Sequence, residues 1–378
     1  MMQPRSDARD DTRMGSGHSA GPPTDPPRVV IKHPASRQGP AVIHTRKLVD
    51  DPARRWIAEN LLVGVAPESV LETMKSAGFA PYEAVQEIQA ALQSPYFLAS
   101  ERVNNRLRKR DWVLAIYRKL SRLHPRSGEI PRRHRLSRDE FLSEYYSANR
   151  PVIITGMMED WPALRKWDLD YFAARFGDRE VQVQMGRNAS PHYEINADQF
   201  VSRIRFGDFL QRVRSAGETN DFYLTAHNDS HNRTALAELW EDIVQVPEYL
   251  RPDQPGGFFW MGPRGTITPF HHDLTNNFMA QVIGRKRLKI APSWDISLMH
   301  NFHHCFSLVD GRDLPAAPQP PFEQPQILEC TLHPGEILFL PVGCLHFVEG
   351  LDITVTVSFT NFVFDNDFHS FYANFGPV

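Results

Sequence analysis

The second half of the chain is divided into short apolar segments by glycine and proline, and this pattern restricts the folds available to it. β-Strands of about four to eight residues bounded by such turns are typical of closed or sandwiched all-β architectures. The expected strands occupy residues 258–261, 268–273, 280–283, 287–290, 327–332, 337–340 and 353–364. This pattern predicts a β-barrel or jelly roll, and no internal repeat is evident.

The motif Thr268-Pro-Phe-His271-His-Asp273 lies in one of these expected strands. Successive side chains on a strand point to opposite faces, so His271 and Asp273 share one face and His272 points away. Two histidines and one carboxylate on one side of Fe(II) leave the other positions open for a chelating cosubstrate and O2. We therefore expect His271 and Asp273 to supply two of three iron ligands.

The third ligand is expected 73 residues beyond Asp273 (346 − 273), at His346, after a turn, an apolar strand and a second turn. A jelly roll brings strands that are distant in sequence side by side, which is what such a ligand set requires. The run His303-His-Cys305 is a weaker metal candidate, because adjacent residues on regular backbone do not all face one ion.

Lys286 follows a glycine turn at Gly284 and is placed to project into the barrel. An unpaired ammonium buried there would cost several kcal/mol, which an anionic cosubstrate would offset. The alternative is a surface lysine between Arg285 and Arg287, which share the opposite face of the strand.

From about Leu136 to Val378, two-thirds of the chain, the sequence resembles the JmjC and cupin-like family of Fe(II)- and 2-oxoglutarate-dependent oxygenases. Within that family it resembles the peptidyl hydroxylases more than the histone demethylases. The residues that carry the resemblance are Thr268-Pro-x-His271-x-Asp273, Asn277, Gln281, Gly284-x-Lys286, Pro334-Gly335 to Pro341, His346 and the β-rich segment from Thr354 to Phe359.

The resemblance implies a mainly β fold with α-helices, a double-stranded β-helix (jelly roll) preceded by an N-terminal helical module. It implies that His271, Asp273 and His346 hold Fe(II) and that Lys286 pairs with the distal carboxylate of 2-oxoglutarate. Thr268 and Asn277 would add hydrogen bonds to the cosubstrate or its surroundings, or else would satisfy local backbone groups. The chain departs from the family at Cys344-Leu345, where many members have a tryptophan pair, and at Ser358, where a number of peptidyl hydroxylases have asparagine.

We expect four regions along the chain: a disordered tail (1–45), a module of three short helices (46–99), a basic amphipathic helix and linker (100–136) and the oxygenase domain (137–378). Between Glu101 and Asp139 there are thirteen Arg and Lys residues and four acidic ones. A solvated helix face is the favoured interpretation of this charge, and contact with an acidic peptide or nucleic acid is the alternative. Helices are also expected over 137–145, 167–176, 206–213 and 236–250.

The composition indicates a soluble, cytoplasmic protein. A net charge of −3 and a pI near 6.6 do not favour nucleic acid as the general partner. Three cysteines are typical of reduced thiols rather than a disulfide framework. The N-terminus has no apolar signal region, and no window is apolar enough for a membrane span.

The expected reaction is hydroxylation of a C–H bond, on a protein or peptide side chain, with O2 and 2-oxoglutarate. A small-molecule substrate and N-methyl-lysine demethylation are the alternatives within this enzyme class. A cupin-type binding protein without activity is the alternative outside it, although a pure scaffold has no need of both the triad and Lys286. The sequence leaves open which residue is oxidised and whether the chain forms a homodimer.

Overall fold

The computed structural model describes residues 47–225, 229–252 and 257–372 of the chain. It contains two compact units, residues 1–106 and 107–378, which are described separately here. The predicted tail (1–45) lies outside the described residues. Among the described helices, none is both long and apolar enough to cross a membrane.

The first unit contains the three short helices expected from the sequence. They are α1 (Asp51–Leu62), α2 (Pro67–Ser76) and α3 (Pro81–Gln93). Proline begins α2 and α3, where the missing N–H costs nothing, and Gly78 turns the chain after α2 at φ +87°. Ile57, Val70 and Ile88 pack in a small core of this unit's own.

Helix α4 (Pro95–Arg122) forms most of the basic segment, as expected, and its C-terminal part belongs to the second unit. The amphipathic character expected of this helix stays a prediction. Leu107 and Trp112 are 48% and 66% exposed, while Arg118 is buried.

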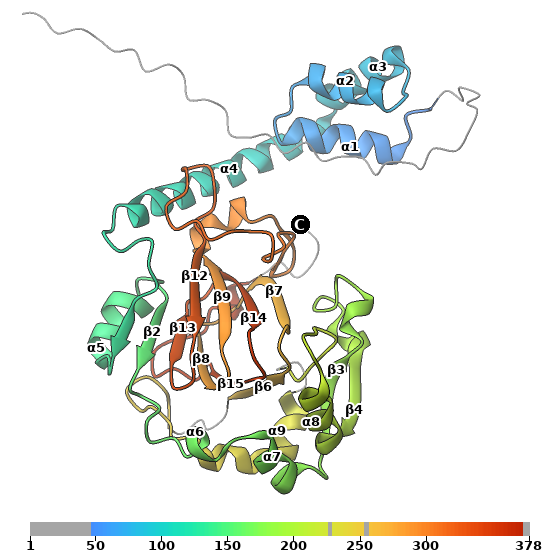
Figure 1. Ribbon diagram of the computed structural model, residues 1–378. Coiled ribbons are helices and arrows are strands. Elements are labelled where there is room, and N and C mark those ends of the chain that lie inside the picture. Colours follow the sequence, from blue (N-terminus) through green and yellow to red (C-terminus); the bar gives the residue numbers. More distant parts are fainter. Residues whose placement is uncertain (1–46, 226–228, 253–256, 373–378) are drawn as a thin grey trace, which may run out of the picture. The chain divides into compact units, whose positions relative to one another are not determined.

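Two sheets dominate the second unit (Figure 1). We call them the β8 sheet and the β7 sheet. In spatial order, the β8 sheet contains β1 (Arg132–His134), β2 (Val152–Thr155), β13 (Ile337–Leu340), β8 (Asn277–Ile283), β15 (Thr354–Phe359) and β6 (Phe258–Gly262).

The β7 sheet contains the remaining barrel strands. In spatial order these are β10 (Asn301–His303), β11 (Phe306–Ser307), β7 (Ile267–His272), β14 (Leu345–Gly350), β9 (Lys286–Ala291) and β12 (Leu328–Leu332). Strands β7, β14 and β9 are hydrogen-bonded neighbours although β14 lies far along the chain from the other two. This interleaved order confirms the predicted jelly roll.

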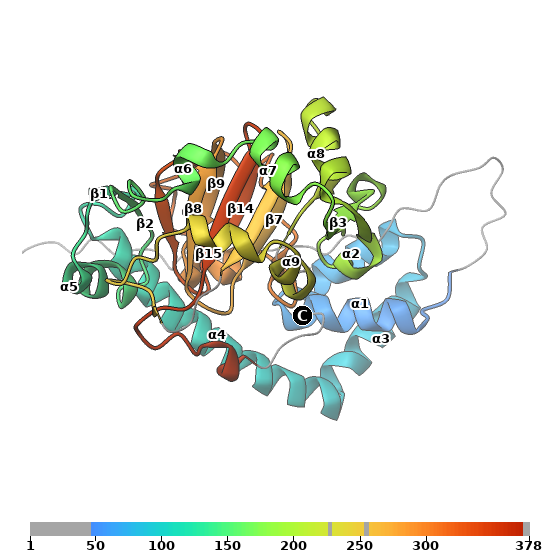
Figure 2. The same cartoon turned by 90° about the horizontal axis from the view of Figure 1, so that it is seen from below.

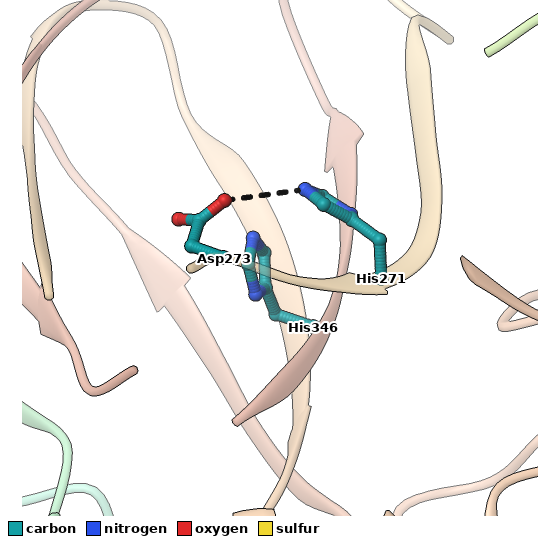
Figure 3. Close-up of side chains that lie close together, drawn as sticks. All are labelled: His271, Asp273 and His346. Carbon is teal, nitrogen blue, oxygen red and sulfur yellow. Dashed lines mark ion pairs between the residues drawn. The ribbon is translucent and has the colours of Figure 1, made fainter. Parts of the chain in front are cut away.

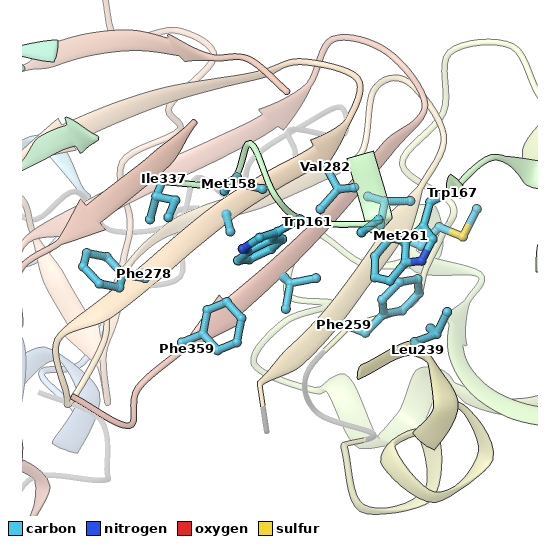
Figure 4. Packing of buried hydrophobic residues seen from close by; sticks show 14 of the residues in the cluster. Met158, Trp161, Trp167, Leu239, Phe259, Met261, Phe278, Val282, Ile337 and Phe359 are labelled. Carbon is cyan, nitrogen blue, oxygen red and sulfur yellow. The ribbon is translucent and has the colours of Figure 1, made fainter. Parts of the chain in front are cut away.

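Alternating side chains build separate hydrophobic layers on the two faces of the β8 sheet. Leu338 and Leu340 point between the sheets, where they pack with Leu288 and Ile290 of β9. Ile337 and Phe339 point outward, into the larger core that includes Phe278 and Trp161 (Figure 4). The outer face of the β7 sheet has its own cluster, which includes Phe270 and Phe347.

Short helices and a small sheet complete the second unit, and Figure 2 places α6, α7 and α9 beside the barrel strands. The small sheet has the order β4 (Val201–Arg205), β3 (Glu180–Met185) and β5 (Phe222–Tyr223). The helical segments are α5 (Arg138–Phe141), a π-helical turn (Leu142–Tyr146), α6 (Ala163–Lys166), α7 (Leu169–Phe176), α8 (Phe206–Ser215), α9 (Asp229–Ala235) and 3-10 turns at Arg187–Ala189, Ala197–Phe200, Ala237–Asp242, Ser293–Leu298 and His369–Phe371.

The helix predicted over 236–250 is wrong. A 3-10 turn ends at Asp242 and the chain continues without regular helix to Leu250. Pro247 disfavours helical backbone at the residue before it, and this explains why the apolar spacing of the segment did not produce a helix.

Candidate functional site

His271, Asp273 and His346 come together between the two sheets. His346 on β14 is the direct ladder partner of His271 on β7, and Asp273 directly follows the end of β7. One potential ligand atom from each residue lies within 4.8 Å of the other two. His271 Nε2 is 3.8 Å from Asp273 Oδ1, and the ring of His346 lies beside this pair (Figure 3).

Both histidines present the same ring nitrogen to the centre of this group. Nδ1 of His271 donates to the carbonyl of Pro269 at 2.9 Å, and Nδ1 of His346 donates to the carbonyl of Cys344 at 3.1 Å. A proton held on Nδ1 leaves the Nε2 lone pair free for a metal. Burial lowers the pKa of His346 to about 4, which keeps the imidazole in its neutral, ligating form.

A β-bulge brings Thr268 to the same cavity as His271. His346 pairs with His271 and Val348 pairs with Thr268. Between these two pairs β14 has one residue, Phe347, whereas β7 has two, Pro269 and Phe270. The extra residue on β7 reverses the alternation, so residues three apart line one cavity. Thr268 therefore lines the cavity beside His271, a position that simple alternation would not predict.

Asn277, at the start of β8, contacts the acidic member of the group. Its Nδ2 donates to Asp273 Oδ2 at 3.1 Å, which leaves Asp273 Oδ1 directed at His271. Hydrogen bonds of this kind orient ligand carboxylates at metal sites. Asn277 Oδ1 is buried and has no partner among the described residues.

Lys286 is buried, and the alternative of a surface lysine is excluded. Its Nζ donates to the hydroxyl of Tyr223 at 3.1 Å, and burial lowers its pKa to about 7. Lys289 on the same strand is also buried, but its Nζ donates to the carbonyls of Gly311 and Leu314, both at 2.6 Å. Only the Lys286 end of β9 therefore presents a weakly satisfied amine to the cavity, among the residues that the structure describes.

The remaining wall of the cavity is mixed aromatic, apolar and polar. It consists of Tyr223, Trp260, Met279, Val348 and Ser358. Trp260 Nε1 donates to Ser358 Oγ at 2.8 Å, so the residue that replaces the family's asparagine is held by a neighbouring strand. No pattern in the sequence marks Tyr223, because it comes from the small sheet, 63 residues before Lys286.

The other metal candidates do not join the group. His272 is buried on the opposite face of β7, with its ring near Tyr372. Within the described residues, the cluster that could hold a metal ion consists of His271, Asp273 and His346 and does not include the 303–305 run.

All three cysteines are free thiols. Burial raises the pKa of Cys305, Cys330 and Cys344 to about 12 in each case.

A second cavity, of about 500 Å³, is also lined by residues of β7. It is larger and more polar than the cavity of the metal group. Ile267 and Pro269 line it, together with Phe306, the ladder partner of His271 on β11. Its charged lining residues include Arg187, Glu194, Asp310 and Arg312. Arg187 is fully buried and donates to Glu194 Oε1 at 2.5 Å and to the carbonyl of Ile267 at 2.8 Å, which ties this wall to β7.

Comparison with known proteins agrees with this arrangement. Residues 138–370 match the model of the cupin-like domain family. The chain is 33% identical over 244 residues to the lysine-specific demethylase JMJ30 of Arabidopsis thaliana, covering 61% of this chain and 54% of that protein. It is 29% identical over 249 residues to the lysine-specific demethylase 8 of Xenopus tropicalis, covering 61% and 52%.

A third relative has a different named role. The tRNA wybutosine-synthesizing protein 5 of Gallus gallus is 26% identical over 234 residues, covering 58% of this chain and 73% of that protein. The chain spans about half the length of the two demethylase relatives. The match over residues 138–370 covers more than half of the chain and includes every residue of the His271, Asp273 and His346 group. The chain therefore belongs to the cupin-like family, whose JmjC-type members use Fe(II) and 2-oxoglutarate.

Proposed function

We propose that the protein is an Fe(II)- and 2-oxoglutarate-dependent oxygenase that hydroxylates a C–H bond on a protein or peptide side chain. The observation that carries this proposal is the convergence of His271, Asp273 and His346 beside the buried amine of Lys286. Lys286 is a buried amine with no carboxylate partner among the described residues, and the donor set consists of two imidazoles and one carboxylate. These are independent features, and this cofactor pair uses both.

The residues fit the proposed metal and cosubstrate. Two imidazoles and one carboxylate are a donor set typical of non-haem Fe(II) oxygenases, and both Nε2 atoms are free to bind. Lys286 would pair with the distal carboxylate of 2-oxoglutarate, which would restore the charge that burial disfavours. Thr268 lines the same cavity and would donate its hydroxyl hydrogen to the cosubstrate.

Bound Fe(II) and 2-oxoglutarate would supply the oxidative chemistry, in which O2 provides one oxygen atom to the substrate and one to succinate, with release of CO2. The protein's own residues position the reactants. The carbonyls of Pro269 and Cys344 fix the two imidazoles, Asn277 fixes the carboxylate, and Trp260 closes the wall opposite. No general base is required from the chain.

The neighbouring 500 Å³ cavity supports a protein or peptide substrate over a small apolar metabolite. Its lining is rich in charged and amide side chains. It includes Ile267 and Pro269 of β7 and Phe306, which pairs with His271 from β11. An extended peptide can place one side chain at the metal group while its backbone and neighbouring residues occupy a polar groove of this size.

The first experiment measures Fe(II) binding under anaerobic conditions and succinate formation from 2-oxoglutarate in air. The wild-type protein should bind Fe(II) and form succinate without added substrate. His271→Ala should lose both, and His272→Ala, which changes the adjacent ring on the opposite face, should keep both. Absence of Fe(II) binding and of succinate in the wild-type protein would overturn the proposal.

Demethylation of methyl-lysine is the second candidate, because two relatives are named lysine-specific demethylases. Intact-mass analysis of peptides treated with the enzyme separates the two reactions. A stable gain of one oxygen atom supports hydroxylation. Formaldehyde release with loss of a methyl group from a methyl-lysine peptide, and no oxygen-bearing product, would replace hydroxylation with demethylation.

A further inference from the structure

A third cavity in the oxygenase unit has no role in the proposed reaction. It has a volume of about 270 Å³ and lies between the last turns of α4 and residues of the barrel. Apolar groups from both elements line it, with Ile290, Leu328 and Cys344 from the barrel side and Tyr117 and Leu120 from α4. It shares no lining residue with the cavity of the metal group.

Buried polar contacts hold the walls of this cavity in place. Arg118 of α4 donates to Asp295 at 2.6 Å, and this ion pair is 6% and 0% exposed. Arg122, one turn further, donates to the carbonyls of Pro320, Pro321 and Gln324. The Gln326 side chain donates to two more carbonyls across the cavity wall, those of Ser127 and Pro318. Because α4 is fixed by a fully desolvated ion pair, the cavity is a built feature of the unit rather than a loose surface groove.

The polar groups around this apolar space favour an anion. Arg126 and Arg150 line it, and neither forms an ion pair with a carboxylate among the residues that the structure describes. The Trp294 indole nitrogen is buried without an acceptor in the described structure. Glu129 supplies one negative charge to the lining, and His124 also lines the cavity, with Nε2 3.4 Å from Arg150 Nη1. The two guanidinium groups therefore outnumber the single carboxylate.

We propose that this cavity is a binding site for a small amphiphilic anion, a medium-chain fatty acid or a molecule of like shape. Its alkyl chain would lie against Ile290, Leu328 and Leu120, and its carboxylate would contact Arg126 and Arg150. The volume lies just below the roughly 300–1,000 Å³ range of small-molecule pockets, which suits a single alkyl chain. The site is separate from the proposed reaction and does not depend on it.

Decanoate binding to the full-length protein, measured by isothermal titration calorimetry, tests this site. We expect one molecule per chain, with Kd on the order of 10–100 µM. Ser121 lies on α4 and lines the cavity, so Ser121→Trp fills the space without removing a core residue. This variant should weaken binding by at least roughly tenfold, because the alkyl chain no longer has room. Lys119→Trp, two residues earlier on an exposed position, should bind like the wild-type protein.

A second set of measurements tests whether the charges of Arg126 and Arg150 contribute to binding. Replacing both cations, Arg126→Gln with Arg150→Gln, should weaken decanoate binding by roughly tenfold or more. Binding of the uncharged analogue 1-decanol should be weaker than that of decanoate in the wild-type protein and insensitive to the double substitution. Circular dichroism verifies that each variant is folded. Equal decanoate affinity in Ser121→Trp and Lys119→Trp, equal affinity for the acid and the alcohol, or no binding up to the solubility limit would each overturn the proposal.

Discussion

The β7 sheet and the β8 sheet face the same interior, but they contribute to it differently. The β7 sheet and the residue after its first long strand supply the ionisable groups: His271, Asp273, His346 and Lys286. The β8 sheet supplies the facing wall: Trp260, Asn277, Met279 and Ser358. The β8 sheet also carries on its other face the largest hydrophobic core of the unit.

This division separates chemistry from stability. The three strands that carry the ionisable groups are hydrogen-bonded neighbours, so their relative positions follow from ladder register. The β8 sheet is anchored from outside by aromatic side chains from α5 and the π-helical turn that follows it. We therefore expect substitutions in the β7 sheet to affect ligand binding more than folding, and core substitutions in the β8 sheet to do the reverse.

The largest effect on stability is expected for Phe339→Ala in β13. Phe339 is fully buried against Phe141, Tyr146 and Phe278, and deleting such a ring costs about 3–5 kcal/mol. Urea unfolding measures this loss. The fraction that remains folded should bind Fe(II) with unchanged affinity, and a parallel loss of metal affinity would contradict the separation of the two sheets.

Lys286→Met, in contrast to Phe339→Ala, should weaken ligand binding without destabilising the protein. We expect it to weaken 2-oxoglutarate binding by roughly 30-fold or more, because one partner of a buried charge pair is lost. The protein without ligand should become more stable at neutral pH, since an amine with a pKa of about 7 no longer has to be buried. Arg287→Met, next to Lys286 on the opposite face of the strand, is the control and should leave cosubstrate affinity unchanged.

The stability gained by this substitution should depend on pH. The pKa of Lys286 falls from 10.5 to about 7 on folding, so the unfolded chain binds more protons between these values and the wild-type protein gains stability as pH rises. The advantage of Lys286→Met should therefore shrink by about 2 kcal/mol from pH 7 to pH 9. Urea unfolding at the two pH values measures this change, and an advantage independent of pH would show that Lys286 is not the titrating group.

Asn277→Ala tests a contact between the two sheets, because Asn277 in β8 donates to Asp273, the residue that follows β7. Loss of its hydrogen bond to Asp273 should weaken metal binding by roughly 10- to 100-fold. Anaerobic titration with Fe(II) measures the change. Asn276→Ala is the matched control, since the Asn276 side chain accepts from the Val342 N–H and not from the metal group. Equal affinities in the two variants would limit Asn277 to lining the cavity.

Ser358→Ala should have the smallest effect. It removes the acceptor of the Trp260 indole N–H at the wall, and one neutral hydrogen bond contributes about 0.5–1.5 kcal/mol. We expect the KM for 2-oxoglutarate to rise by roughly two- to tenfold, with metal affinity unchanged. A loss as large as that of Lys286→Met would mean that Ser358 contacts the cosubstrate directly.

Much of this arrangement could be predicted from the sequence, because strand alternation and turn residues are local signals. The shared location of His271 and Asp273 and the burial of Lys286 followed from them. The proximity of His346 required the jelly-roll topology as well. Tyr223 could not be predicted, because a two-residue strand in a separate sheet has no periodicity of its own. The bulge at Pro269 was also missed, since an extra residue is visible only when the partner strand is known.

The raised pKa values of the three thiols have a consequence for a protein that would hold Fe(II) in air. A thiolate is a soft metal ligand and is the form of cysteine that oxidants convert to sulfenic acid. Cys305 immediately precedes the ladder partner of His271, and the Cys344 carbonyl accepts the hydrogen bond of His346. With pKa values near 12, both remain protonated at neutral pH. The folded chain therefore keeps the thiols of Cys305 and Cys344 in the protonated form, which is the poorer metal ligand and the less readily oxidised one.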